Sequence, residues 1–163
     1  MANRFASLLL ALFVLSPAIA LATSVEKCNR GANYPVKVSG VEISPDPVAR
    51  GEPATFTISA STVKWLTISD SFLAENAISE GKLVIDVKYF FLHVHQETKD
   101  LCEETSCPIS SGDFSLAHQQ TLPSITPPGS YTITMKMVGG GGEELTCITF
   151  GFSIGFIAPV ADA

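Results

Sequence analysis

The stretch Leu83–Pro108 reads LVIDVKYFFLHVHQETKDLCEETSCP, and its pattern decides the fold class. In its first half, large apolar residues recur at every second position, which is the two-residue period of a half-buried β-strand. From Tyr89 onward both faces of this strand are apolar, so we expect its end to form one wall of an apolar cavity. The inward-facing candidates on the strand are Leu83, Ile85, Val87, Tyr89 and Phe91.

A small cysteine loop follows this strand. Cys102 and Cys107 enclose the four residues EETS, and Pro108 comes directly after them. The chain has four cysteines, and an even count in a secreted protein indicates two disulfides, for which three pairings exist. A local bridge between Cys102 and Cys107 is the simplest pairing, and it leaves Cys28 to pair with Cys147. Paired C-x-x-C spacing is lacking, which disfavours a zinc site.

The N-terminal segment is predicted to be a cleaved secretory signal peptide covering residues 1–22. Arg4 precedes the apolar run Leu8–Leu15, and small residues follow at Ala18–Ala22. The run is too short to span a bilayer. Residues 23–157 are then expected to form a single domain, and residues 158–163 a frayed tail. A signal peptide together with disulfides predicts a secreted protein or one in an endomembrane lumen, extracellular or vacuolar.

The charge balance argues against nucleic acid as a partner. The chain carries 10 Lys and Arg against 16 Asp and Glu, a formal net charge of −6, and the signal segment contains only one of the basic residues. Nucleic-acid binding and docking through a basic membrane-facing surface both require an excess of positive charge.

Short alternating stretches separated by Pro- and Gly-rich turns recur along the rest of the chain. This arrangement predicts an all-β protein, an immunoglobulin-like antiparallel β-sandwich of about seven strands in two sheets. Between Thr62 and Glu80 the pattern fits either a short amphipathic helix near Trp65 or a long loop. The expected strands, besides the one described above, lie at Val36–Val38, Val41–Ile43, Ala54–Ala60, Ile109–Leu122, Tyr131–Met137 and Ile148–Ile154.

Large inward-facing side chains are the main candidates for a binding site. Periodicity places them inside the sandwich, but it leaves open whether they fill a close-packed core or line a cavity. The pocket candidates are Phe56, Ile58, Val87, Tyr89, Phe91, Phe114, Tyr131, Ile133, Met135, Ile148, Phe150 and Phe152.

Catalytic and metal-binding chemistry is poorly supported by the motifs present. Gly151–Gly155 matches G-x-S-x-G, but no histidine follows it, as the order of a hydrolase triad requires. His93, His95 and Glu97 share one face of an extended strand and could contact a metal, yet a further ligand with suitable spacing is missing. His118 lies in a polar run and is expected to face solvent. We therefore expect no catalytic residues, no metal and no cofactor.

Five segments form a recognisable set of motifs: Asp86–Phe90, His93–His95, Asp100–Pro108, Pro127–Tyr131 and Leu145–Cys147. Together they resemble the plant branch of the ML-domain lipid-recognition family, which is described as phosphatidylglycerol/phosphatidylinositol transfer-like. The likeness covers nearly the whole mature chain.

This resemblance implies a two-sheet sandwich that holds a lipid tail in its interior, in a secreted, vacuolar or lysosome-like location. It also supports the disulfide pairing Cys28–Cys147 and Cys102–Cys107. The segment Val63–Ile78 is longer than this branch usually carries between the neighbouring strands. It is interpreted either as an added lid or as a loop outside the shared architecture. The expected function is a non-enzymatic, monomeric carrier of a sterol or phospholipid that contacts membranes transiently. The alternative is a secreted interaction module that acts as an accessory to a cell-surface receptor.

Overall fold

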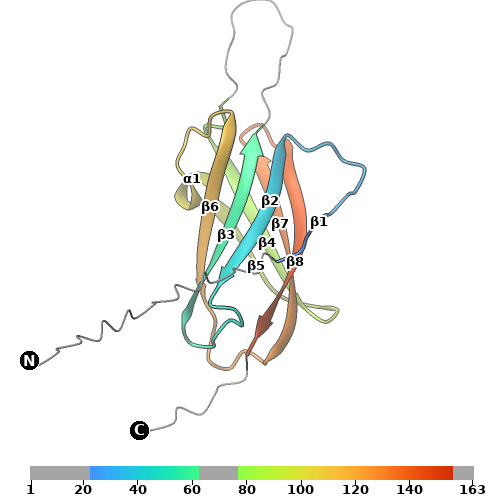
Figure 1. Cartoon of the computed structure of the whole chain (residues 1–163), viewed down its shortest axis with the longest axis vertical. Coiled ribbons are helices and arrows are strands. Elements are labelled where there is room, and N and C mark those ends of the chain that lie inside the picture. The colour runs from blue at the N-terminus through green and yellow to red at the C-terminus, as the bar shows by residue number, and fades with distance from the viewer. Residues whose placement is uncertain (1–22, 63–76, 156–163) are drawn as a thin grey trace, which may run out of the picture.

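The structure, a computed structural model, describes residues 23–62 and 77–155, and within them it is an antiparallel β-sandwich. One sheet has five strands in the order β1-β8-β7-β4-β5, and the other has three in the order β2-β3-β6. In Figure 1 the three-stranded sheet faces the viewer. The elements are β1 (Val25–Lys27), β2 (Val36–Ser44), β3 (Pro53–Thr62), β4 (Gly81–Tyr89), β5 (Leu92–Asp100), α1 (Leu101–Glu104), β6 (Gly112–Thr121), β7 (Gly129–Gly139) and β8 (Glu144–Ile154). The fold class predicted from sequence is confirmed.

Three predictions concern residues outside this description: the signal peptide at 1–22, the tail at 158–163, and the helix or loop near Trp65. Of the segment between β3 and β4, the described part includes Ile78, whose amide donates to the carbonyl of Ile109 at 3.0 Å. No helix among the described residues is long and apolar enough to cross a membrane.

The stretch Leu83–Val94 is a β-hairpin, so its interpretation as one continuous strand was wrong. β4 ends at Tyr89 and β5 begins at Leu92, with Tyr89 and Leu92 paired across the ladder. Phe90 and Phe91 form the turn, and Phe90 adopts φ 54, in the left-handed region. The apolar second face that suggested a covered strand therefore belongs to the turn and to the start of β5, which are exposed.

Other boundaries also differ from the prediction. Val36–Val38 and Val41–Ile43 are one strand, β2, with an irregularity in its pairing between Val38 and Gly40. β1 was not predicted, because three residues are too few to show a period. The strand expected at Ile109–Leu122 begins later, at Gly112. With these changes the described residues contain eight strands, one more than the estimate of about seven.

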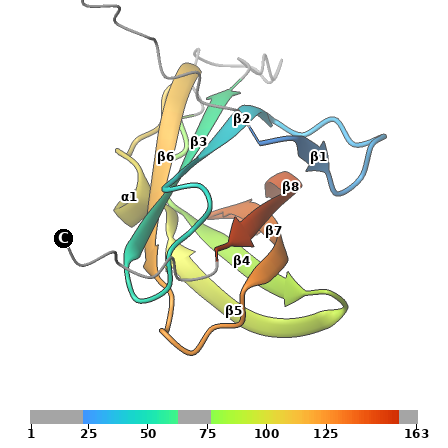
Figure 2. The same cartoon turned by 60° about the horizontal axis from the view of Figure 1, so that its bottom comes forward.

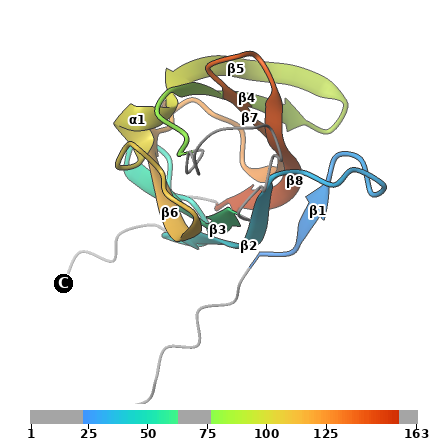
Figure 3. The same cartoon turned by 90° about the horizontal axis from the view of Figure 1, so that it is seen from above.

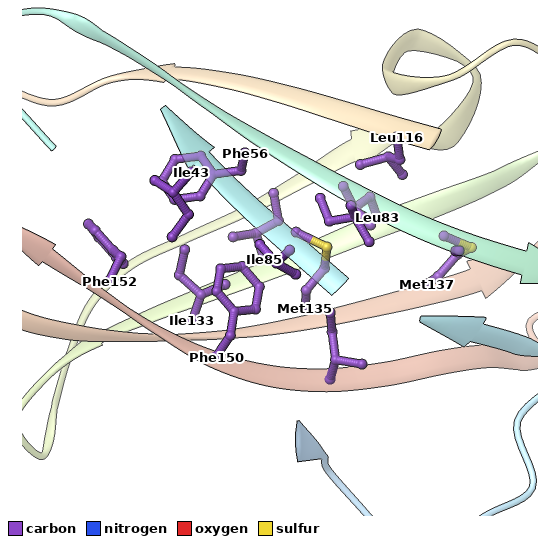
Figure 4. Packing of buried hydrophobic residues seen from close by; sticks show 14 of the residues in the cluster. Ile43, Phe56, Leu83, Ile85, Leu116, Ile133, Met135, Met137, Phe150 and Phe152 are labelled. Atoms are coloured by element: carbon purple, nitrogen blue, oxygen red, sulfur yellow. The ribbon is translucent and has the colours of Figure 1, made fainter. Parts of the chain in front are cut away.

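The core lies between the two sheets and is built from alternate residues of nearly every strand (Figure 4). Phe56 on β3 meets Phe152 on β8 edge to face, with ring centroids 5.6 Å apart. Buried apolar side chains such as Leu83, Met135 and Leu116 come from both sheets. Burial of this kind, at about 25 cal/mol per Å² of apolar surface, is the main favourable term in folding.

The two sides of the sandwich are closed differently. On one side β2 contacts β8 and β1, and the amide of Thr23 donates to the carbonyl of Val41 at 3.1 Å. On the other side the edge strands β5 and β6 face each other, and α1 lies between them at one end (Figure 3). Both predicted disulfides are confirmed: Cys28–Cys147 joins the end of β1 to β8, and Cys102–Cys107 closes the loop that contains α1.

Candidate functional site

A cavity of about 430 Å³ lies between the two sheets, bounded by the edge strands β5 and β6. The β4–β5 turn and the connection between β6 and β7 lie at the end of the sandwich that comes forward in Figure 2. The lining is mainly apolar and comes from six strands and this connection. The lining residues are Phe56, Ile85, Val87, Tyr89, Val94, His95, Glu97, His118, Gln120, Thr121, Leu122, Pro123, Ile125, Thr126, Pro127, Tyr131, Ile133, Phe152 and Ile154.

Half of the predicted pocket residues line this cavity. They are Phe56, Val87, Tyr89, Tyr131, Ile133 and Phe152. Four others are buried in the sandwich away from the cavity: Ile58, Met135, Ile148 and Phe150. Because inward-facing residues at different heights on a strand share the same period, sequence periodicity could not separate these two groups.

Two predicted pocket residues lie elsewhere. Phe91 is 93% exposed in the β4–β5 turn, so its assignment to an inward strand face was wrong. Phe114, near the start of β6, is half-buried against the core and does not line the cavity.

Aromatic rings form one wall of the cavity. The ring centroids of Tyr89 and Tyr131 are 4.7 Å apart, and those of Tyr131 and Phe152 are 5.2 Å apart in a stacked arrangement. The Tyr131 hydroxyl donates to the carbonyl of Pro127 at 2.7 Å, which satisfies its polar end. Burial raises the pKa of Tyr131, so the ring stays neutral and presents an uncharged face to the cavity.

The connection between β6 and β7 supplies lining residues that sequence reasoning missed. Leu122, Pro123, Ile125, Thr126 and Pro127 all contribute. The only available signal was the concentration of prolines and apolar residues in a segment interpreted simply as a turn.

Polar lining groups gather at one corner of the cavity. His118 on β6 is only 4% exposed, so the prediction that it faces solvent was wrong. Its Nε2 lies 3.0 Å from Glu97 Oε1 on β5, and its Nδ1 lies 3.2 Å from Glu104 Oε2 on α1. His118 is inward because it shares a strand face with the buried Leu116, and the polar neighbours along the chain concealed this parity.

The residues considered for metal binding or catalysis do not have the arrangement that a metal site or a nucleophile elbow requires. His93 Nδ1 pairs with Asp86 at 2.8 Å, and the described residues contain no group of three or more His, Cys, Asp or Glu side chains able to hold a metal ion. Ser153 lies within β8 and pairs with Ser130 of β7, whereas a nucleophile elbow needs a strand-to-helix turn.

Exposed apolar side chains lie in the β4–β5 hairpin and in the connection between β6 and β7, the two segments that bring Val94 and Ile125 to the cavity. Among the described residues, the large hydrophobic side chains that stand exposed are Phe90, Phe91, Leu92, Val94 and Ile125. Three of them belong to the β4–β5 turn and its exit, and Val94 and Ile125 also line the cavity. We call these five residues the apolar rim. Exposed large apolar side chains that gather beside a cavity indicate a site of interaction.

Together the fold and the cavity define a class of protein: a two-sheet β-sandwich that holds an apolar cavity between its sheets and opens it at an apolar rim. The ML-domain family profile matches residues 22–154, and the chain belongs to this family. The resemblance seen in the sequence is thus confirmed.

Individual relatives and a solved structure agree with this assignment. The chain is 32% identical over 130 residues to a phosphatidylglycerol/phosphatidylinositol transfer protein of Aspergillus oryzae, covering 76% of this chain and 67% of that protein. It is 34% identical over 150 residues to an MD-2-related lipid-recognition protein of Arabidopsis thaliana, covering 88% and 84% respectively. The crystal structure of a Niemann-Pick type C2 protein from the Japanese carpenter ant superposes with a TM-score of 0.59 at 16% identity, covering 81% of this chain and 99% of that one, which shows a shared fold.

Proposed function

We propose that this chain is a non-enzymatic lipid carrier that holds the apolar part of a sterol or phospholipid in the cavity between its sheets. The observation that carries the proposal is the 430 Å³ apolar cavity that opens at the apolar rim. This volume lies within the range of about 300–1,000 Å³ typical of small-molecule sites. The relatives named for phospholipid transfer and lipid recognition support the same class of ligand.

Hydrophobic transfer is a sufficient driving force for this function. Burial of each methylene contributes about 0.8 kcal/mol, so a tail of about 16 methylenes gains roughly 13 kcal/mol. Association costs about 4–15 kcal/mol, so the net free energy ranges from about 9 kcal/mol in favour of binding to almost none. Binding driven in this way needs no catalytic group.

The apolar rim is the surface that meets the membrane during transfer. A lipid moving between a bilayer and the cavity passes the rim, and contact with the bilayer shields its tail from water. The excess of acidic residues gives no basic surface for electrostatic docking, so apolar insertion is the favoured mode. Receptor binding through the same rim is the competing use, and stable capture of one membrane protein would favour it.

Both disulfides support function in an oxidising compartment, outside the cell or in an endomembrane lumen. Mass spectrometry of the secreted protein tests this placement, because cleavage near residue 22 is expected and an intact Met1 would contradict it.

Ligand binding is tested by lipid extraction from the purified protein and by titration with a fluorescent sterol and a fluorescent phospholipid. Ile133→Trp places an indole in the cavity, whereas Thr132→Trp adds the same group to the exposed face of β7 and serves as the matched control. Saturable binding that Ile133→Trp abolishes and Thr132→Trp preserves is expected. Absence of any bound lipid and of any probe uptake would reject the proposal.

A further inference from the structure

The side of the sandwich between β5 and β6 is a seam that no strand ladder closes. β5 is the edge strand of the five-stranded sheet, and β6 is the edge strand of the three-stranded sheet. At one end the seam is held by the loop containing α1, where Thr105 Oγ1 donates to the carbonyl of Ser115 at 2.7 Å. At the other end β5 and β6 contribute Val94 and Gln120 to the cavity lining. The seam therefore runs from a fixed end to an open one.

His118 bridges this seam between its fixed and open ends. The imidazole reaches Glu97 on β5 through Nε2 and Glu104 on α1 through Nδ1, at 3.0 and 3.2 Å. The side chains of all three residues are largely buried, with exposed fractions of 5%, 16% and 12% for His118, Glu97 and Glu104. The His118 side chain thus connects β6, the edge strand of the smaller sheet, to β5, the edge strand of the larger sheet, and to α1, which follows β5.

The two carboxylates give this bridge a charged component. A hydrogen bond between an imidazole and an ionised carboxylate is stronger than one between two neutral groups. The other charged or titratable groups at Glu97 are Lys99, whose Nζ lies 3.4 Å from Oε2, and His95, whose Nε2 lies 3.8 Å from the same oxygen. From β3, the ring of Phe56 covers His118 at a centroid distance of 6.5 Å.

We propose that His118, Glu97 and Glu104 form a latch across the seam, and that opening of this latch sets the rate at which lipid enters and leaves the cavity. This inference rests on the proposed lipid-carrier function. His118 and Glu97 line the cavity, so their separation would extend its opening along the seam.

The remaining boundaries of the cavity open less readily than the seam. Neighbouring strands within each sheet are joined by backbone ladders, which run without a register shift between β3 and β6 and between β4 and β7. The side opposite the seam is held by backbone bonds, including Val48 N to Ser153 O at 2.8 Å. Separation of β5 from β6 breaks only side-chain contacts, which makes it the least costly route to a wider mouth.

Glu104 provides the cleanest test, because it supports the latch without lining the cavity. Glu104→Ala removes the partner of Nδ1, whereas Glu103→Ala removes an exposed carboxylate from the same turn of α1 and is the matched control. We expect Glu104→Ala to raise both the association and the dissociation rate of a fluorescent sterol by about tenfold, as loss of one charge-assisted bond predicts. Its equilibrium affinity should change less than about twofold, because both rates rise together.

Stopped-flow fluorescence measures the rates, and Glu104→Gln, which keeps an acceptor oxygen, should fall between wild type and Glu104→Ala. Hydrogen exchange without lipid supplies a second readout, in which amides of β5 exchange faster in Glu104→Ala than in Glu103→Ala while those of β8 do not. Unchanged rates and unchanged β5 exchange in folded Glu104→Ala would overturn the latch. Rates altered equally by Glu103→Ala would also overturn it. If the wild-type protein bound no probe, the proposed carrier function would be rejected, and the proposed role of the latch in lipid exchange would be rejected with it.

Discussion

Replacement of Phe91 separates membrane contact from ligand binding. Phe91 is 93% exposed and contributes nothing to the cavity lining, so Phe91→Ser should leave both the fold and the cavity intact. Full burial of a phenylalanine side chain is worth about 1.5–3 kcal/mol. Since 1.4 kcal/mol is tenfold, loss of this contact should weaken partition into phosphatidylcholine vesicles by about 10- to 100-fold.

Flotation with vesicles and transfer of a fluorescent phospholipid between vesicles measure this effect. Phe91→Trp is the matched control, because an indole also inserts into the membrane interface and should preserve binding and transfer. Uptake of a fluorescent sterol supplied without vesicles should be unchanged in both variants. The thermal midpoint of unfolding should also remain that of the wild type.

Two results would refute the reasoning. Phe91→Ser with wild-type vesicle affinity and transfer rate would show that the β4–β5 turn does not enter the membrane. A parallel loss of sterol uptake without vesicles would show that the exposed ring contributes to the cavity after all.

Three further predictions concern the fold and its charges. Removal of Cys28–Cys147 should cost about 5 kcal/mol and removal of Cys102–Cys107 about 2, because their sequence separations are 119 and 5; urea unfolding measures both, and the reverse order would contradict the chain-entropy argument. The hydrogen bond from Lys136 holds the pKa of Glu144 below its usual range, so the stability it provides is present above the ordinary Glu pKa of about 4.3 and is lost as the pH falls through the lowered value. Both side chains are more than one third exposed, so Glu144→Gln should destabilise by less than about 1 kcal/mol at pH 7, and a deficit that persists at the lowest pH would argue against this assignment. Gly129→Ala should destabilise by about 1–3 kcal/mol, since φ is 138 and the added Cβ would lie 3.2 Å from a tyrosine ring of the cavity wall; an unchanged thermal midpoint would contradict this.

The parts of the fold that could be predicted from the sequence are those in which the alternation of apolar and polar residues, or the spacing of cysteines, is enough to decide the structure. Tyr131–Met137 alternates without interruption, and β7 has the buried face that this pattern indicates. The two disulfides followed from a short loop and the remaining pair. For β7 and for Cys102–Cys107, neighbouring residues contain the information that fixes the local structure, and the Cys28–Cys147 pairing then follows because only two cysteines remain.

The turn at Phe90–Phe91 could not be predicted in this way. A phenylalanine with positive φ is rare, and two adjacent aromatic residues are typical of a strand. The ring of Phe90 packs edge to face on Tyr89 at 4.5 Å, a contact that forms only once the chain has turned. The position of the cavity could not be predicted from the sequence either. Phe56 lines the cavity and Ile58 does not, although both side chains point inward from β3.

The departures from local rules lie around one feature, the cavity. Phe90 takes an unfavourable backbone conformation, Phe91 exposes an aromatic ring, and His118 buries a titratable group between two carboxylates. A stable sandwich needs none of these features, since β7 and the part of β8 from Ile148 to Ile154 build their buried faces by ordinary alternation. Conflicts between local preference and observed structure tend to mark functional sites. Their gathering at the rim and the seam argues that the opening of the cavity, and not only its apolar interior, serves the carrier function.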